Sequence, residues 1–122
     1  MLDIWCIFWI KQCIHTKPPK DKWVVIVCID GVYKGFFINK GINDFVKKRP
    51  FLLASQVLIK KDDYGFLIQD SYIDCQKLYD FSYDDLDSGR GKLLTETIKD
   101  IKKVVKDSET LEKRYINMIM AN

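Results

Sequence analysis

Apolar runs and polar turns alternate through the first half of the chain, which is the pattern of a β-rich fold. Ile4 to Ile14 alternates imperfectly, and Trp23 to Ile29 is a continuous, mainly β-branched run. Runs of the second kind are typical of strands buried on both faces. Tyr33 to Ile38 follows Asp30-Gly31, and an Asp-Gly pair between apolar runs is a strong hairpin signal. We therefore expect the second and third strands to be antiparallel neighbours.

Shorter elements are expected in the middle of the chain. Within residues 42–49, apolar side chains at i, i+3 and i+4 predict a one-sided helix that ends at Pro50. Segments 53–59 and 64–68 are predicted as strands joined by a charged turn. Residues 70–75 alternate between two faces, so Asp70, Tyr72 and Asp74 should share one face, and Ser71, Ile73 and Cys75 the other.

The end of the chain predicts helices. We expect the sheet to end before the acidic and glycine-containing stretch 84–91, which is predicted as a flexible break. Thr95 is a candidate N-cap for a first helix and Ser108 for a second, each with one apolar face. The second apolar stripe consists of Leu111, Tyr115, Met118 and Ile119. It is either core or a face that awaits a partner or a second copy.

Together these elements predict one α+β domain, mostly β, over residues 1–122. Five or six short strands linked by tight turns favour a small antiparallel barrel over residues 1–81, with the short helix at 42–49. Helices over residues 92–120 would close one side of it. An open antiparallel sheet is the alternative topology. A chain of 122 residues has room for one core.

Cysteine spacing argues against a metal site. Structural zinc ligands occur in pairs a few residues apart, and the chain offers only Cys13 with His15, its single histidine. The opening ten residues carry Asp3, lack a basic start and reach Lys11 after about half the length of a membrane span. We therefore expect an opening strand, no membrane anchor, no metal or cofactor, reduced thiols and a cytoplasmic location.

Charge is distributed unevenly along the chain. Residues 1–61 hold 11 Lys or Arg against 4 Asp or Glu, whereas residues 62–122 hold 9 against 13. A basic half suits a polyanion such as a nucleic acid, and scattered solvating lysine is the alternative. The candidate contacts to a single strand are Lys17, Lys20, Lys22, Tyr33, Lys34 and Lys40. Lysines that protect exposed strand edges would give the same pattern.

Four segments of the chain carry a resemblance to a known family. They are Asp3-Ile4-Trp5, Lys22-Trp-Val-Val-Ile-Val27 after a long loop, Gly35-Phe-Phe-Ile-Asn39, and Phe66-Leu-Ile-Gln-Asp-Ser-Tyr-Ile-Asp-Cys75. In their order they resemble the PemK/MazF-like growth-inhibitor toxins. The resemblance implies a small SH3-like barrel with short helices, and it implies homodimers and antitoxin partners.

The resemblance also implies metal-independent cleavage of single-stranded RNA. The family uses a basic residue at the start of the second strand and a hydroxyl-bearing residue after the third. This chain has Asp21-Lys22 where the family usually has Arg-Pro, and Asn39-Lys40 where Thr or Ser is expected. Lys22 would stabilise a phosphorane-like state as a point charge, without the two-point grip of a guanidinium. Asn39 joins Lys40 among the predicted RNA contacts.

Each further candidate catalytic group has a structural role as its alternative. His15 is the one side chain whose ordinary pKa suits acid–base chemistry at neutral pH, so His15 and Lys22 are the predicted catalytic pair; a surface loop role is the alternative. Asp70 and Asp74 would lie about 13 Å apart on a regular strand, too far to share a reacting centre. Ser71 has no histidine near it in sequence for a hydrolase triad. Trp5, Trp9 and Trp23 are predicted to be core.

Two functions follow from the sequence. The first is a toxin-like endoribonuclease of a toxin–antitoxin or phage-defence module. The second is a catalytically inactive barrel of the same ancestry that binds nucleic acid or protein in a larger assembly, and Asn39-Lys40 favours it. An enzyme that acts on small molecules has no sequence feature in its support.

Overall fold

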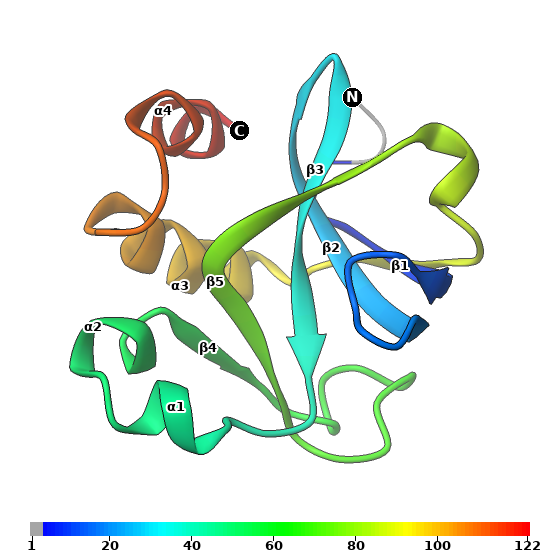
Figure 1. Cartoon of the computed structure of the whole chain (residues 1–122), viewed down its shortest axis with the longest axis horizontal. Coiled ribbons are helices and arrows are strands. Elements are labelled where there is room, and N and C mark those ends of the chain that lie inside the picture. Colours follow the sequence, from blue (N-terminus) through cyan, green and yellow to red (C-terminus); the bar gives the residue numbers. More distant parts are fainter. Residues whose placement is uncertain (1–3) are drawn as a thin grey trace.

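The computed structural model describes residues 4–122, and within them six antiparallel strands form one strongly curved sheet (Figure 1). Its spatial order is β4-β5-β3-β2-β1-β6. The strands are β1 (Cys6–Cys13), β2 (Lys20–Asp30), β3 (Val32–Asn39), β4 (Gln56–Ile59), β5 (Ser71–Phe81) and β6 (Gly89–Lys92). The sheet makes a half-barrel, which confirms the predicted fold class of a mostly β, SH3-like antiparallel barrel with short helices.

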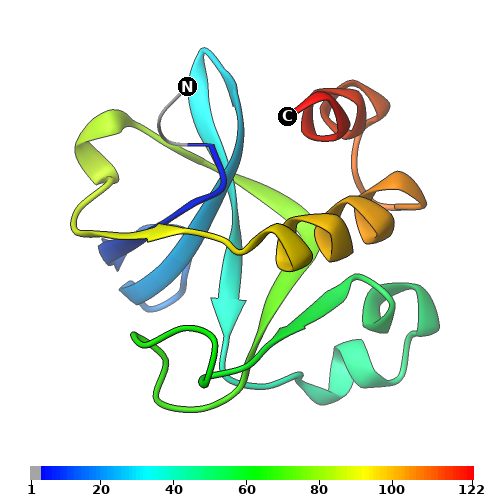
Figure 2. The same ribbon diagram turned by 180° about the vertical axis from the view of Figure 1, so that it is seen from behind.

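The C-terminal helices α3 (Thr95–Lys106) and α4 (Lys113–Ala121) lie on one side of this half-barrel (Figure 2). The other helical segments are α1 (Asp44–Lys47), α2 (Pro50–Leu53) and the 3₁₀ turn η1 (Tyr83–Asp85). α3 packs against β4 and β5, and α4 packs against β2. None of the helices described is long and apolar enough to cross a membrane.

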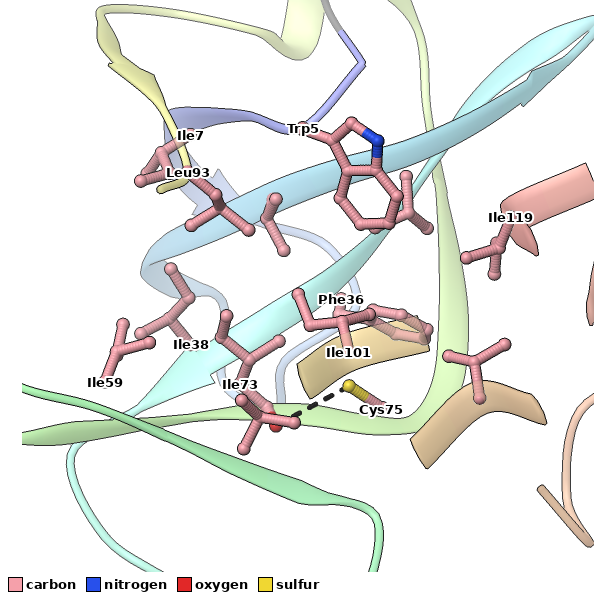
Figure 3. Packing of buried hydrophobic residues seen from close by; sticks show 14 of the residues in the cluster. Trp5, Ile7, Phe36, Ile38, Ile59, Ile73, Cys75, Leu93, Ile101 and Ile119 are labelled. Atoms are coloured by element: carbon pink, nitrogen blue, oxygen red, sulfur yellow. Dashed lines mark hydrogen bonds between the residues drawn. The ribbon is translucent and has the colours of Figure 1, made fainter. Parts of the chain in front are cut away.

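The main core lies between the sheet and the two C-terminal helices (Figure 3). Phe36, Ile73, Ile101 and Ile119 are fully buried in it. The C-terminal stripe is therefore core: Ile119 is inside, and Tyr115 and Met118 pack against the same cluster. Burial of these apolar side chains is the dominant stabilising contribution.

Polar contacts fix α4 to the hairpin of β2 and β3. Arg114 and Tyr115 both donate hydrogen bonds to the carboxylate of Asp30, which precedes the hairpin turn. The side-chain amide of Asn122 donates to the carbonyl oxygen of Val27 at 2.8 Å. These contacts hold the end of the chain against the central strands.

The hairpin and the buried β2 run agree with the sequence. β2 pairs with β3 across Asp30 and Val32, and Gly31 has a positive φ of 75° that glycine adopts without strain. Residues 24–28 are all buried because the opposite face of the sheet has its own apolar cluster. That second cluster consists of Ile10, Cys13, Val24, Ile26, Phe37 and Phe81.

Three predicted elements differ from the structure. Residues 64–68 are a loop and not a strand, because Tyr64 is anchored by side-chain hydrogen bonds to Thr97 and to the backbone N–H of Leu94. The first short helix ends at Lys47, Pro50 begins α2, and the strand expected over 53–59 is shortened to β4 because α2 and a turn occupy residues 53–55. The expected flexible break contains β6, which pairs with β1.

The helix starts also differ from the predicted caps. Thr95 is the first residue of α3, and its N-cap is Leu94. The Ser108 hydroxyl accepts hydrogen bonds from the N–H groups of Thr110 and Leu111 and so closes the turn before α4. Met1 to Asp3, the first residues of the expected opening strand and of the resemblance, lie outside the described residues.

Gly35 lies on β3 where the backbone of β2 approaches closely. A Cβ atom there would lie 2.6 Å from the Val24 side chain and 2.7 Å from the carbonyl oxygen of Val25. Gly35→Ala is therefore expected to lower the free energy of unfolding by about 1–3 kcal/mol. Gly41→Ala is the control, because a Cβ atom there meets nothing within 4 Å. Equal urea midpoints for the two variants would contradict this packing.

Candidate nucleic-acid interface

A groove of about 700 Å³ opens where β2 begins and β3 ends. The two strand ends meet because Trp23 pairs with Ile38 in the antiparallel register, which places Lys22 beside Asn39. We call this cavity the Lys22 groove. Its lining comes from β1, β2, β3 and the loop after β3, the β4–β5 loop, and the first residue of β5: Trp9, Lys20, Asp21, Lys22, Trp23, Ile38, Asn39, Lys40, Gly41, Asn43, Phe66, Leu67, Ile68 and Ser71.

Lys22 is held in place on the wall of this groove. Its ammonium donates a hydrogen bond of 2.5 Å to Oδ1 of Asn39 and lies 5.1 Å from the centre of the Phe37 ring. Burial lowers the pKa of Lys22, and the positive charge of Lys20 lowers it further. None of the ion pairs found among the described residues includes Lys22. Its charge is therefore held by a neutral amide at the edge of the groove.

Four of the predicted site residues meet here. Lys20 and Lys40 are exposed and line the same cavity as Lys22 and Asn39. Like charges gathered around one hollow raise the local concentration of anions. Asp21 also lines the groove, and its Oδ1 accepts a hydrogen bond from the N–H of Gln12. This cluster can bind the phosphate backbone of a nucleic acid.

The aromatic lining of the groove was not predicted from the sequence. Trp5 is buried, as predicted, but Trp9 and Trp23 are only half-buried and line the cavity with Phe66. Trp23 also packs against the main core. The signal available in the sequence was the placement of Trp9 and Trp23 on strands beside Lys20 and Lys22, the pattern of rings among cations.

His15 lines a second groove, of about 590 Å³, which we call the His15 groove. Its Nε2 donates a hydrogen bond to the carbonyl oxygen of Asp80 at 2.8 Å, and its ring contacts Tyr79 and Phe81. The lining residues are Ile14, His15, Lys17, Lys34, Gln76, Lys77, Leu78, Tyr79, Asp80, Thr110, Leu111, Glu112 and Tyr115. The structure therefore does not bring His15 and Lys22 into one groove.

The other predicted contacts also lie away from the Lys22 groove. Lys17 is exposed at the His15 groove, and Tyr33 lies near Tyr83, with 6.2 Å between ring centres. Lys34 is buried and forms an ion pair of 2.6 Å with Asp80. Burial alone would lower the pKa of Lys34, but the hydrogen bond and charge of Asp80 outweigh it and raise the pKa. Lys34 is thus already matched to a carboxylate within the protein.

Carboxylates and thiols take structural positions. Asp70 accepts a hydrogen bond from the loop N–H of Lys61, and Asp74 accepts one from the side chain of Gln56. Burial raises the pKa of Cys28 to about 11 and that of Cys75 well above its ordinary value, so both thiols stay protonated at neutral pH. Among the described residues, no group of three or more His, Cys, Asp or Glu side chains is placed to hold a metal ion.

The half-barrel has the architecture of the MazF-like toxins. Among solved structures, it is similar to the Mycobacterium tuberculosis toxin MazF-mt6, with a TM-score of 0.63 over 88% of this chain and 98% of that chain. The two sequences are 16% identical, so the likeness is one of fold. No family model and no curated protein matches the sequence.

Proposed function

We propose that the chain is a toxin-like endoribonuclease that cleaves single-stranded RNA without a metal ion, and that the reaction takes place in the Lys22 groove. The observation that carries this proposal is the convergence of Lys20, Lys22, Asn39 and Lys40 on one cavity. The MazF-like fold supports it, because the neighbour of known structure is a toxin. The antiparallel register supports the proposal, because it brings Lys22, near the start of β2, beside Asn39, at the end of β3.

The groove offers groups for each part of RNA cleavage. The 2′-oxygen of one nucleotide forms a bond to phosphorus while the bond to the 5′-oxygen of the next nucleotide breaks. The products are a 2′,3′-cyclic phosphate and a 5′-hydroxyl. The ammonium of Lys22 would stabilise the negative charge that grows on the phosphorane. We assign the 2′-hydroxyl proton to the carboxylate of Asp21, and the leaving oxygen takes its proton from solvent.

A second candidate function rests on Asn39. A hydroxyl group can accept a proton and donate one at the same oxygen, whereas the amide of Asn39 has separate donor and acceptor atoms, so Asn39 does not replace the hydroxyl of the family in relaying a proton. The hydrogen bond from Lys22 to Asn39 instead supports a binding role. The second candidate is therefore an inactive barrel that binds nucleic acid or protein within a larger assembly.

The proposed biological setting rests on the family resemblance. A toxin of this kind would act in the cytoplasm within a toxin–antitoxin or phage-defence module, with an antitoxin and a second copy of the chain as partners. On this proposal, expression of the chain alone arrests growth.

Incubation with RNA tests the proposal. Purified protein should cleave mixed single-stranded RNA in the presence of EDTA and leave 5′-hydroxyl ends. Binding of the RNA without cleavage would favour the inactive barrel. Absence of both binding and cleavage would contradict the nuclease and would leave, of the second candidate, only a barrel that binds protein.

The dependence of the cleavage rate on pH above neutrality gives a further prediction. Because burial lowers the pKa of Lys22, its ammonium loses its charge at a lower pH than an ordinary lysine. Cleavage should therefore fall as the pH rises towards that lowered pKa, whereas Lys22→Arg should keep its rate to higher pH, since a guanidinium stays charged. A DNA strand with a single ribonucleotide, corrected for cleavage in buffer alone, gives the two profiles. Superimposable alkaline limbs would be inconsistent with a charged Lys22 in catalysis.

A further inference from the structure

Three aromatic rings from separate segments meet inside the Lys22 groove. Trp9 of β1 lies opposite Trp23 of β2 in the strand register, with 4.5 Å between ring centres and 56° between ring planes. Phe66, from the loop between β4 and β5, contacts the Trp23 ring at 4.6 Å and 54°. All three side chains are half-buried and line the cavity, so parts of the rings face its open space.

Positive charge surrounds these rings. The guanidinium of Arg90 lies 5.3 Å from the centre of the Trp23 ring. Exposed Lys20 and Lys40 line the same cavity, and neither takes part in an ion pair found among the described residues. Rings beside cations that have no acidic partner match a ligand with flat apolar faces joined by phosphates.

We propose that Trp9, Trp23 and Phe66 form a base-stacking subsite of the Lys22 groove, which binds an unpaired base of an RNA strand whose phosphates lie at the exposed Lys20 and Lys40. The identity of the strand as RNA rests on the proposed function, whereas the stacking of a base rests on the position of the three rings in the groove. A base within a duplex is already stacked and paired, so this subsite selects single-stranded segments, loops and ends.

The rings also have a structural role, which the test has to separate from binding. Trp23 and Phe66 pack against the main core, so their loss would affect folding as well as binding. Trp9 is outside that cluster and is the better position for substitution. Trp9→Leu keeps an apolar side chain and removes the large ring. Tyr83→Leu is the matched control, because Tyr83 is 70% exposed and lies outside the groove.

The experiment compares two strands that the protein cannot cleave. One is a short 2′-O-methyl RNA of mixed sequence, and the other is a strand of equal length and charge with abasic residues. The wild-type chain should bind the first more tightly than the second, and more tightly than a 2′-O-methyl duplex. Trp9→Leu should weaken binding of the base-carrying strand by at least about fivefold and leave binding of the abasic strand unchanged. Phe66→Leu should act in the same direction, and Tyr83→Leu should bind as the wild-type chain does.

The outcomes separate this inference from the proposed function. If the wild-type chain cleaves RNA but Trp9→Leu and Phe66→Leu bind both strands as the wild type does, the stacking subsite is wrong and the nuclease stands. If binding depends on the bases and on Trp9 but no RNA is cleaved, the subsite stands and the nuclease is wrong. Equal affinity of the wild-type chain for base-carrying and abasic strands, or no binding of either, overturns the inference.

Discussion

Replacing Lys22 with alanine is expected to lower the rate of RNA cleavage by about a hundredfold or more, the usual loss when one group that stabilises a charged transition state is removed. Lys22 is half-buried, is oriented by Asn39 and faces the cavity. Exposed Lys20 and Lys40 remain in the variant, so affinity for RNA should fall much less than the rate. The measurement is the single-turnover rate of RNA cleavage at a saturating concentration of protein.

Two further variants control for charge and for folding. Lys22→Arg keeps a cation at the position and should retain a large part of the rate. Lys11→Ala removes a lysine that pairs with Asp87 at the surface, outside the groove, and should cleave as the wild-type chain does. Cleavage by Lys22→Ala at the wild-type rate, with Lys11→Ala also active, would remove Lys22 from the chemistry.

Replacing Phe36 with alanine is expected to lower the free energy of unfolding by about 3–5 kcal/mol, because its ring leaves a cavity that the rigid sheet cannot fill. Phe36 is fully buried on the central strand β3 and packs beneath the C-terminal helices (Figure 3). Urea unfolding followed by circular dichroism measures the loss. A small domain has about 5–15 kcal/mol of stability in total, so this variant should be close to unfolding.

Phe45 provides the matched control for this core substitution. Its ring is 59% exposed on α1, and the Arg49 guanidinium lies 3.6 Å from the ring centre. Phe45→Ala should change the free energy of unfolding by no more than about 1 kcal/mol. A loss as large as that of Phe36→Ala would mean that the core is not where the structure places it.

Local sequence patterns predicted the elements that are stabilised locally or by burial on both faces. The Asp30-Gly31 turn marks the β2–β3 hairpin, and the continuous apolar run marks a strand buried by two clusters. The loop over 64–68 looks like a strand because its side chains are apolar. It is held by the hydrogen bonds of Tyr64 to the start of α3, about 30 residues away in sequence, and local periodicity does not report such contacts.

In the candidate site, too, contacts between neighbouring strands could be predicted and contacts between distant segments could not. Lys22 and Asn39 were predicted from the family resemblance, and the β2–β3 hairpin, which the turn residues make visible, brings them together. His15 was predicted to act with Lys22 because its ordinary pKa suits acid–base chemistry at neutral pH and because it lies in the basic loop before β2. Its loop instead reaches the far end of β5, where Asp80 accepts its hydrogen bond across 65 positions of sequence. Trp9 and Trp23 were assigned to the core because they lie within apolar strand segments. The alternation of apolar and polar residues shows which face of the sheet a side chain takes, but it does not show how far the helices and loops extend over that face.

The central claim is that RNA binds in the Lys22 groove and not in the His15 groove, and photocrosslinking distinguishes the two directly. A 2′-O-methyl strand that carries 4-thiouridine would be crosslinked to the wild-type chain and the modified peptides identified by mass spectrometry. We expect crosslinks on Trp9, Trp23 or Phe66, which line the Lys22 groove. Crosslinks confined to Tyr79 or Tyr115 of the His15 groove would contradict the assignment.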